Sequence, residues 1–346
     1  MLEYQFRVTK YDPGLRDRTG AFTGHDWTSV TEVGESFNGR VLTQQRYDQV
    51  ENAYLQAVEL FAHASGVDQL IVRDPSLPPG IDLRVASSAA TYAALELFPL
   101  SLHDVYDGLQ VPLTVGVKLV RAMLRETGVW CRLEADGRFF AHVGWDYYLY
   151  IGSNQPCEQA ADQVRRLGLF VEHQTSPYDP ELQEPQTYPP ADDAFWARVE
   201  LLAAKAHSEL PLLEMWAGNA WRWHLVVPGA RLEQLRQALK PRALLTIYPE
   251  PPLPITDTTG VQIAERARQL LNSDSAVAGV NGLIEEADTG RLRFDYLLDE
   301  EDLSLWLPAS RSASRCGIYP ASAHDQPGAL EGVLPDADGI IRARRQ

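Results

Sequence analysis

The sequence predicts an α+β fold with two modules of mainly antiparallel sheet, each covered by helices. Three observations favour it. Apolar residues recur at helical spacing in several segments, and glycine closes most of them, as at Gly66 and Gly128. Two-residue turn signals, Asp136-Gly137 and Gly218-Asn219, join stretches with the composition of strands. A proline-rich segment separates the two halves of the chain.

The first half begins with a predicted strand at 4–11, followed by a long loop at 12–42 that is rich in Gly, Asp, Thr and Arg. Thr43 caps a predicted helix that ends at Gly66 and carries one apolar stripe. The later elements of this half are a strand at 70–72, a helix from Thr114 to Gly128, strands at 129–135 and 138–151, a helix from Pro156 to Gly168, and a strand at 169–171. Gly144, in the middle of the second long strand, predicts a bulge.

The order helix, strand, strand, helix, strand recurs in the second half. Its predicted elements are a helix at 195–206, strands at 210–217 and 220–227, a helix at 232–239 and a strand at 244–248. A third, degraded copy is predicted from a helix at 261–271 and strands at 276–285 and 291–298. Because each unit alone leaves one sheet face bare, we expect sheets packed against helix layers, in a ferredoxin-like manner.

Five prolines between Ser176 and Asp193 predict an extended connector, because proline removes backbone donors and blocks helices. We therefore predict an N-terminal domain at 1–175, a linker at 176–192 and a C-terminal domain at 193–319. The tail, 320–346, is rich in small residues, Asp, Gly and Pro, and is predicted to be loosely ordered.

The composition points to a cytoplasmic protein. No apolar run approaches the roughly 18–20 residues that span a bilayer, and the first ten residues lack the pattern of a signal peptide. Three widely spaced cysteines, Cys131, Cys157 and Cys316, predict neither a disulfide framework nor a zinc site. The net charge of −16 disfavours general binding to nucleic acids and suits a basic protein partner.

Motifs of the large enzyme classes are absent. The chain has no G-x-x-x-x-G-K-[ST] loop, no G-x-G-x-x-G after a strand, no H-E-x-x-H and no G-x-S-x-G. The eight histidines include no pair at metal-ligand spacing on a helix. We therefore predict no cofactor, no metal and no catalytic residues, while a site assembled from distant residues stays open.

One polar group stands out in the first loop, up to Thr28. A histidine beside carboxylates, with an aromatic residue for stacking, suits a recognition or acid–base site. The alternative is an ordered loop held by Asx-turns and an Arg–Asp pair, with its tryptophan in the core. The candidate binding residues here are Tyr11, Asp12, Arg16, Asp17, His25, Asp26 and Trp27.

A second candidate is the aromatic segment Gly144–Tyr150. As an alternating strand it places Trp145, Tyr147 and Leu149 on one face and Asp146, Tyr148 and Tyr150 on the other. The second face resembles a binding surface, or one that stacks RNA bases. In the alternative, helices cover both faces and the tyrosines fill space.

Aromatic residues recur on the equivalent hairpin of the second half, where Trp221 and Trp223 point the same way. Core packing is one interpretation, and an aromatic binding surface is the other. The four acids at 299–302 are typical of a solvated turn and also suit contact with a basic partner.

The first half also resembles a known group of proteins. The resemblance rests on the opening segment 4–13, Arg16-Asp17, Asp26-Trp27-Thr28-Ser29, the segments 130–134 and 142–146, Tyr148, Tyr150, and Gly168-Leu169-Phe170. These resemble a family of small, mainly actinobacterial proteins of uncharacterised activity, some of them labelled RNA-binding. The resemblance covers about residues 4–178 and implies a stand-alone first domain.

Three hypotheses follow. The first is a non-catalytic protein-binding protein, of the immunity type that neutralises a basic toxin. The second is RNA binding through an aromatic sheet face, with a basic patch around Arg132, Arg138, Arg165 and Arg166. The third is an enzyme with a pocket where His25 or Asp26 meets the segment Gly144–Tyr150.

Overall fold

A computed structural model describes residues 2–77, 105–177, 188–206, 209–227, 229–248, 253–254, 257–272, 279–290, 292–320 and 329–336. The chain forms two compact units, the first extending to Gln186 and the second beginning at Thr187. Each combines helices with mainly antiparallel sheet, so the predicted α+β class is confirmed. The predicted linker at 176–192 lies mostly outside the described residues.

The first unit is built on one seven-stranded sheet in the order β5-β4-β6-β7-β8-β1-β9, in which all neighbours are antiparallel. A short hairpin, β2 and β3, lies in the first loop. The strands are β1 (Tyr4–Thr9), β2 (Ser36–Phe37), β3 (Arg40–Val41), β4 (Gln69–Ser76), β5 (Gln110–Pro112), β6 (Trp130–Ala135), β7 (Phe139–Val143), β8 (Leu149–Ser153) and β9 (Phe170–His173).

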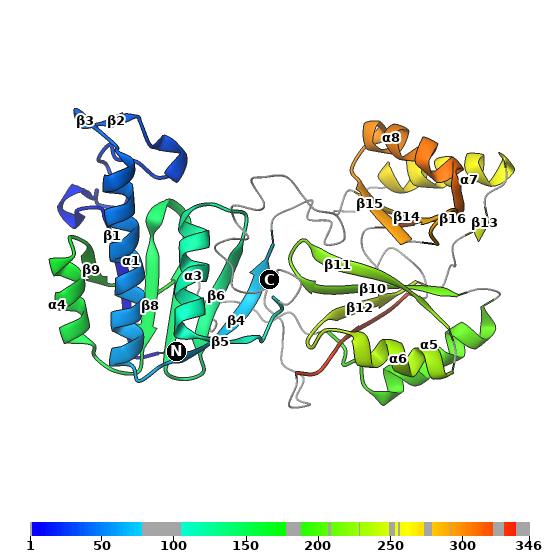
Figure 1. Cartoon of the computed structure of the whole chain (residues 1–346), viewed down its shortest axis with the longest axis horizontal. Coiled ribbons are helices and arrows are strands. Elements are labelled where there is room, and N and C mark those ends of the chain that lie inside the picture. Colours follow the sequence, from blue (N-terminus) through cyan, green and yellow to red (C-terminus); the bar gives the residue numbers. More distant parts are fainter. Residues whose placement is uncertain are drawn as a thin grey trace. The chain divides into compact units, whose positions relative to one another are not determined.

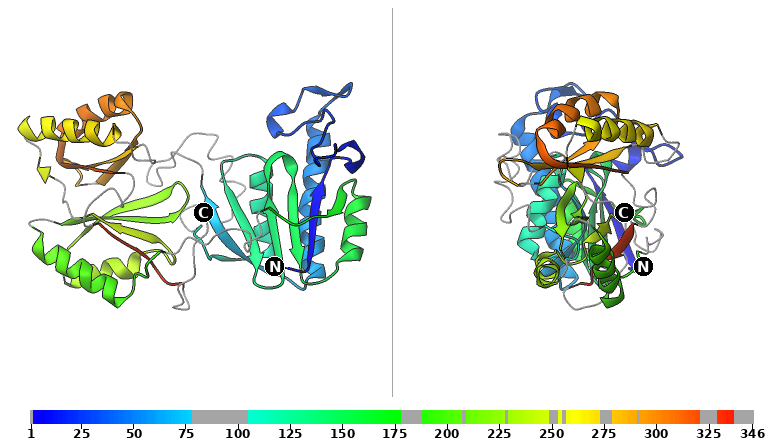
Figure 2. Two further views of the ribbon diagram at one scale, coloured as in Figure 1. Left: turned by 180° about the vertical axis from the view of Figure 1, so that it is seen from behind. Right: turned by 90° about the vertical axis from the view of Figure 1, so that its right-hand side faces the viewer.

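In the described part of this unit, three helices cover one face of the sheet: α1 (Gln44–Ala64), α3 (Leu113–Leu124) and α4 (Glu158–Arg166) (Figure 1). Thr43 caps α1, as predicted, by accepting a hydrogen bond from the Arg46 backbone N–H at 3.2 Å. Phe6 packs against Phe61 of α1 at 5.0 Å between ring centroids. The view from behind shows the other face of the sheet (Figure 2).

The predicted continuous strand at 138–151 is wrong. The chain forms β7, turns at 144–148 and returns as β8, and Gly144 precedes a 3₁₀ turn instead of forming a bulge within a strand. Trp145 and Tyr147, which were predicted to lie on the same face of that strand, have different surroundings: Trp145 is exposed and Tyr147 is buried.

The second unit contains two four-stranded sheets, each with two helices. The first sheet has the order β11-β10-β12-β17 and the second the order β13-β16-β14-β15. The first group comprises α5 (Asp193–Lys205), β10 (Leu210–Ala217), β11 (Ala220–Val226), α6 (Ala230–Ala238), β12 (Leu244–Ile247) and β17 (Leu330–Val333); the second comprises β13 (Leu253–Pro254), α7 (Asp257–Leu271), β14 (Val280–Glu286), β15 (Leu292–Leu297), α8 (Glu300–Arg311) and β16 (Ala313–Pro320).

The predicted repeat is confirmed in this unit and is more complete than expected. In both groups the first strand of the hairpin (β10 or β14) lies between the second hairpin strand (β11 or β15) and the closing strand (β12 or β16). A fourth strand (β17 or β13) lies at the edge, beyond the closing strand. The acids at 299–302, predicted to be a solvated turn, begin α8, with Asp299 as its cap. The predicted loose tail also needs correction, because its residues 330–333 form β17 and pair with β12.

The two sheets of the second unit share a buried cluster made of Leu213, Trp223, Tyr248, Leu283 and Tyr319. Helices lie on the outer side of each sheet, giving the layer order helices, sheet, sheet, helices (Figure 1). A second cluster, which includes Ile263, Trp306 and Ile318, joins α7 and α8 to their sheet. The first unit departs from the predicted repeat: the order there is helix, three strands, helix, strand, because the predicted second strand is divided into β7 and β8, and the closing strand β9 pairs with β1.

Candidate functional site

The two candidate groups of the first half meet at one end of the first unit. The Arg16 guanidinium donates a hydrogen bond to the Tyr148 hydroxyl at 2.9 Å. The rings of Tyr11 and Tyr148 lie 5.6 Å apart, and Trp27 meets Tyr147 edge-on at 4.9 Å. The structure therefore brings together residues that are more than a hundred positions apart in the sequence.

At this end the segment 144–148, which we call the Trp145 turn, presents one large apolar side chain to solvent. Trp145 is 85% exposed. The turn is closed by hydrogen bonds from Gly144 N–H to Tyr148 C=O at 2.7 Å and from Tyr148 N–H to Trp145 C=O at 3.1 Å. Asp146 and Tyr147 both have left-handed backbones, with φ of 54° and 61°. Left-handed non-glycine residues cost on the order of 1–3 kcal/mol each and persist only where the surroundings enforce them.

Buried tyrosines enforce this conformation. The Tyr54 hydroxyl donates to the Tyr147 carbonyl at 2.7 Å. The Tyr147 hydroxyl lies 2.7 Å from the Leu124 carbonyl oxygen and 2.9 Å from the Tyr47 hydroxyl. Burial raises the pKa of Tyr54 and of Tyr147 and raises that of Tyr47 to about 12, so all three stay neutral donors at physiological pH. The turn is thus fixed by uncharged hydrogen bonds within the core.

The buried carboxylate next to Tyr47, that of Glu51, is paired with two arginines. Glu51 is buried and accepts two hydrogen bonds from Arg125, at 2.5 and 2.9 Å, while the Arg121 guanidinium lies 3.2 Å away. The hydrogen bond to Glu51 also raises the pKa of Arg125. A buried carboxylate needs such partners, and one that has them is poorly suited to accept a substrate proton.

A lysine anchors the first loop to the same core. The Lys10 ammonium lies 2.9 Å from the Asp26 carboxylate, 4.2 Å from the Tyr11 ring centroid and 4.0 Å from that of Trp27. Burial lowers the pKa of Lys10 to about 8, and Asp26 opposes that shift. Asp26 is therefore the counter-charge of a buried amine, and buried Trp27 is one wall of its cage.

Two arginines, Arg7 and Arg16, lie over the ring of Tyr148 and share the carboxylate of Glu172. Arg7 donates twice to Glu172, at 3.2 and 3.0 Å, and Arg16 donates to the same carboxylate at 3.4 Å. Both guanidinium groups lie over the Tyr148 ring, at 5.7 and 5.3 Å from its centroid. Tyr150, half-buried, is the register partner of Arg7, and both lie on the face opposite Phe6, which packs against α1.

The remaining residues of the first loop maintain its shape. Asp12 accepts from Gly14 N–H at 2.8 Å, and Asp17 accepts from Thr19 N–H at 2.8 Å. The hydrogen bond from the Thr19 side chain lowers the pKa of Asp17. His25 is exposed and stacks on Phe37 at 5.3 Å. Much of the loop thus follows the alternative interpretation, with Asx-turns and a tryptophan in the core.

The candidates of the second half lie in its core. Trp223 is buried between the sheets, 5.5 Å from the ring of Tyr248 and 5.7 Å from that of Tyr319. Trp221 packs, partly buried, against the same cluster. These residues stabilise the contact between two sheets, so the predicted aromatic binding surface does not form there.

The predicted basic patch is dispersed. Arg132 is buried and forms an ion pair with Asp74. Arg138 donates to the Gly66 carbonyl at 3.2 Å, and Arg165 forms an ion pair with Asp162. These contacts occupy three of the four arginines that the RNA hypothesis invokes.

Sequence reasoning missed the residues that hold the site in place, including Lys10, Tyr54 and Glu172. Lys10 was within the first predicted strand, and Tyr54 was one member of an apolar helical stripe. No local pattern distinguishes a tyrosine that fills the core from one that caps a distant carbonyl. The adjacent pair Lys10-Tyr11 was the one available signal, because an amine next to an aromatic ring at a strand end is suited to a cation–π contact.

No family model, no curated protein and no solved structure matches the chain. Within the described ranges, no three His, Cys, Asp or Glu side chains are grouped so that they would hold a metal ion. Each described helix is too short or too polar to cross a lipid bilayer.

Proposed function

We propose that this protein is a non-catalytic binding protein that recognises a basic protein partner through the Trp145 turn. One observation carries the proposal: an 85% exposed tryptophan sits on a left-handed turn that buried hydrogen bonds hold in place. Tryptophan dominates binding energy at protein interfaces, and a rigid anchor loses little entropy on binding.

The charge distribution supports a basic partner. The chain carries −16 overall. At the turn itself Asp146 is exposed, and the nearby Glu126 contributes, with Glu51, to raising the pKa of Tyr147. Opposite fields speed encounter and reject partners of the wrong sign. An immunity protein that neutralises a basic toxin is the class that best combines these properties.

The engagement of the titratable groups favours binding over catalysis. Glu51, Asp26 and Glu172 are all paired with cations. The buried tyrosines remain protonated at neutral pH. A general base needs access to a substrate proton, and the ion pairs occupy these three carboxylates.

Binding measurements with purified variants test the proposal. The wild type, Trp145→Ala and Leu305→Ala would be immobilised and exposed to the products of neighbouring genes and to an RNA oligonucleotide. Leu305 is a matched control, because it is an apolar side chain 73% exposed in the second unit. We expect one basic protein to bind the wild type, Trp145→Ala to weaken it by at least ~30-fold, and Leu305→Ala to change it by less than about twofold.

Three outcomes contradict the proposal. The first is equal binding of the partner by Trp145→Ala and the wild type, when unfolding curves show both to be folded. The second is the absence of any basic partner among the neighbouring products. The third is salt-sensitive capture of RNA that Tyr150→Ala removes and Trp145→Ala retains, because that result favours recognition by the sheet face.

A further inference from the structure

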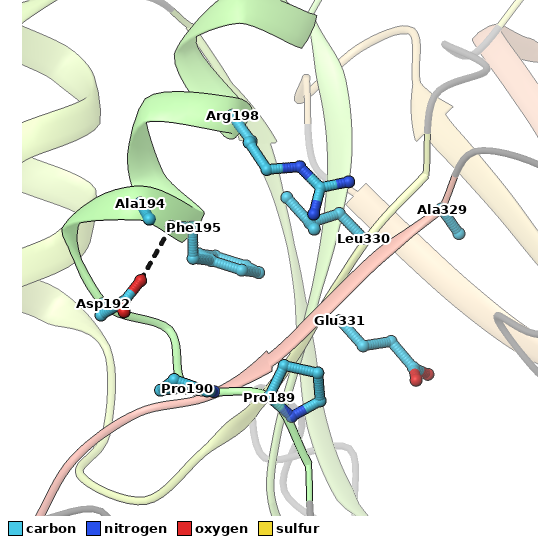
Figure 3. A pocket seen from close by; sticks show the side chains of 9 residues that line it. All are labelled: Pro189, Pro190, Asp192, Ala194, Phe195, Arg198, Ala329, Leu330 and Glu331. Atoms are coloured by element: carbon cyan, nitrogen blue, oxygen red, sulfur yellow. Dashed lines mark hydrogen bonds between the residues drawn. The ribbon is translucent and has the colours of Figure 1, made fainter.

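The second unit holds a pocket of about 460 Å³ between the first turns of α5 and the strand β17. Pro189, Pro190, Phe195 and Leu330 supply its apolar lining, and Arg198 and Glu331 supply charged groups (Figure 3). Pockets for small ligands typically measure about 300–1,000 Å³ and combine apolar walls with a few polar groups. The size and lining of this pocket therefore suit a small ligand or the end of a peptide.

The local sequence builds the pocket rigidly. Asp192 caps α5 by accepting a hydrogen bond from Phe195 N–H at 3.0 Å (Figure 3). The segment before it pairs with β17, because Ala191 N–H donates to the Val333 carbonyl and Val333 N–H donates to the Pro189 carbonyl, each at 2.8 Å. The backbone on both sides of the pocket is therefore fixed by hydrogen bonds.

The floor depends on a glycine. A Cβ at Gly332 would lie 2.8 Å from the Phe195 ring and 3.1 Å from the Ala191 Cβ. The missing side chain thus lets Phe195 lie flat against β17. Phe195 and Leu330 are both buried, and they form a fixed apolar surface beneath the more exposed proline rings.

The guanidinium of Arg198 is accessible to a ligand in the pocket. Arg198 is exposed, and among the described residues none forms a hydrogen bond or an ion pair with it. Figure 3 shows its guanidinium extending over Leu330, on the same side as the Phe195 ring. The Asp192 carboxylate is used by the helix cap. A guanidinium beside an apolar wall is well suited to hold one carboxylate by two parallel hydrogen bonds.

We propose that this pocket binds a ligand with one carboxylate and an adjoining apolar group. Arg198 holds the carboxylate, and the apolar group lies against Phe195, Leu330 and the prolines. The Glu331 side chain points away from Arg198 (Figure 3), so it leaves the guanidinium open to the carboxylate of a ligand. Either a free small molecule or the C-terminal residue of a peptide offers this chemistry.

Titration of the full chain with N-acetyl-L-phenylalanine, followed by NMR or calorimetry, tests the proposal. We expect a dissociation constant on the order of 1 mM, as for other ligands of this size. The corresponding amide, which lacks the negative charge, should bind at least about tenfold more weakly. A heptapeptide with a free C-terminal phenylalanine separates the two sources: tighter binding of the peptide indicates a chain end, and equal or weaker binding indicates a small molecule.

The variants Arg198→Gln and Arg311→Gln complete the test. Both remove one exposed arginine of the second unit, and Arg311 lies on α8, outside the lining of the pocket. Arg198→Gln should weaken binding at least about tenfold, whereas Arg311→Gln should leave it unchanged. Absence of binding at about 10 mM ligand, equal binding of the amide, or equal losses in the two variants would overturn the proposal.

Discussion

The Tyr54 hydroxyl donates a hydrogen bond of 2.7 Å to the carbonyl oxygen of Tyr147. The same hydroxyl accepts a hydrogen bond of 2.7 Å from Lys10 N–H, just beyond the end of β1. One buried group therefore joins α1, the end of β1 and the Trp145 turn. The shape of the exposed turn therefore depends on a residue of the core.

Replacing Tyr54 by Phe should destabilise the protein by about 1–3 kcal/mol, because a buried carbonyl and a backbone N–H each lose their partner. Urea unfolding curves measure the loss. The matched control is Tyr4→Phe, at a position that is less buried, and it should change the free energy of unfolding by less than about 0.5 kcal/mol. Equal stabilities for the two variants would show that the Tyr54 hydrogen bonds do not hold the turn.

At Asp146 the usual preference for alanine over glycine should be reversed. Its φ of 54° is left-handed, which glycine adopts freely and alanine does not. Asp146→Gly should therefore be more stable than Asp146→Ala by about 1 kcal/mol. Thermal unfolding of the two variants provides the comparison. A more stable alanine variant would mean that the turn relaxes out of the left-handed region in solution.

Local signals predicted most elements of the second unit. The Gly218-Asn219 turn lies between β10 and β11, and Asn219 has the positive φ of 59° that such a turn requires. Helical stripes located α5, α6 and α7 to within a few residues. α8 was missed because its sequence contains Pro308 and begins with three acids, although Asp299 before them is an ordinary helix cap.

The Trp145 turn could not be predicted in the same way. Three of its five residues are aromatic and favour strands, and no glycine occupies the two left-handed positions. Contacts with Tyr54 and Leu124, both distant in sequence, override that preference. For the same reason the sequence suggested the two candidate segments and gave no sign that Arg16 joins them through Tyr148. Spacing along a chain does not report contacts between distant segments.

Gly152 of β8 lies directly opposite Phe140 of β7 and leaves room for its ring. A Cβ there would lie 2.1 Å from the Phe140 ring. Gly152→Ala should therefore destabilise the protein by about 1–3 kcal/mol, the usual cost of overpacking. The additional change Phe140→Leu makes room and should recover part of the loss, as a double-mutant cycle in urea would show. Additive losses in the double variant would contradict direct contact between the two sites.

Lys10 should make stability depend on pH in an unusual direction. Its pKa is about 8 in the folded protein, whereas a lysine in the unfolded chain has its ordinary pKa of 10.5, so the unfolded chain binds this proton more tightly. Unfolding then takes up a proton between these values, and the free energy of unfolding rises with pH across that window. From pH 7 to pH 9.5 the contribution is about 2 kcal/mol.

The variant Lys10→Met removes this group and should show a rise smaller than the wild type by that amount. Lys118→Met, at an exposed position on α3, is the control and should keep the rise of the wild type. Urea unfolding at pH 7 and pH 9.5 measures both, and the ionisation of tyrosines and cysteines in the unfolded chain cancels because each variant is compared with the wild type. An equal rise in Lys10→Met and the wild type would mean that the ammonium is hydrated in solution. In that case Asp26 and the rings of Tyr11 and Trp27 would not enclose it.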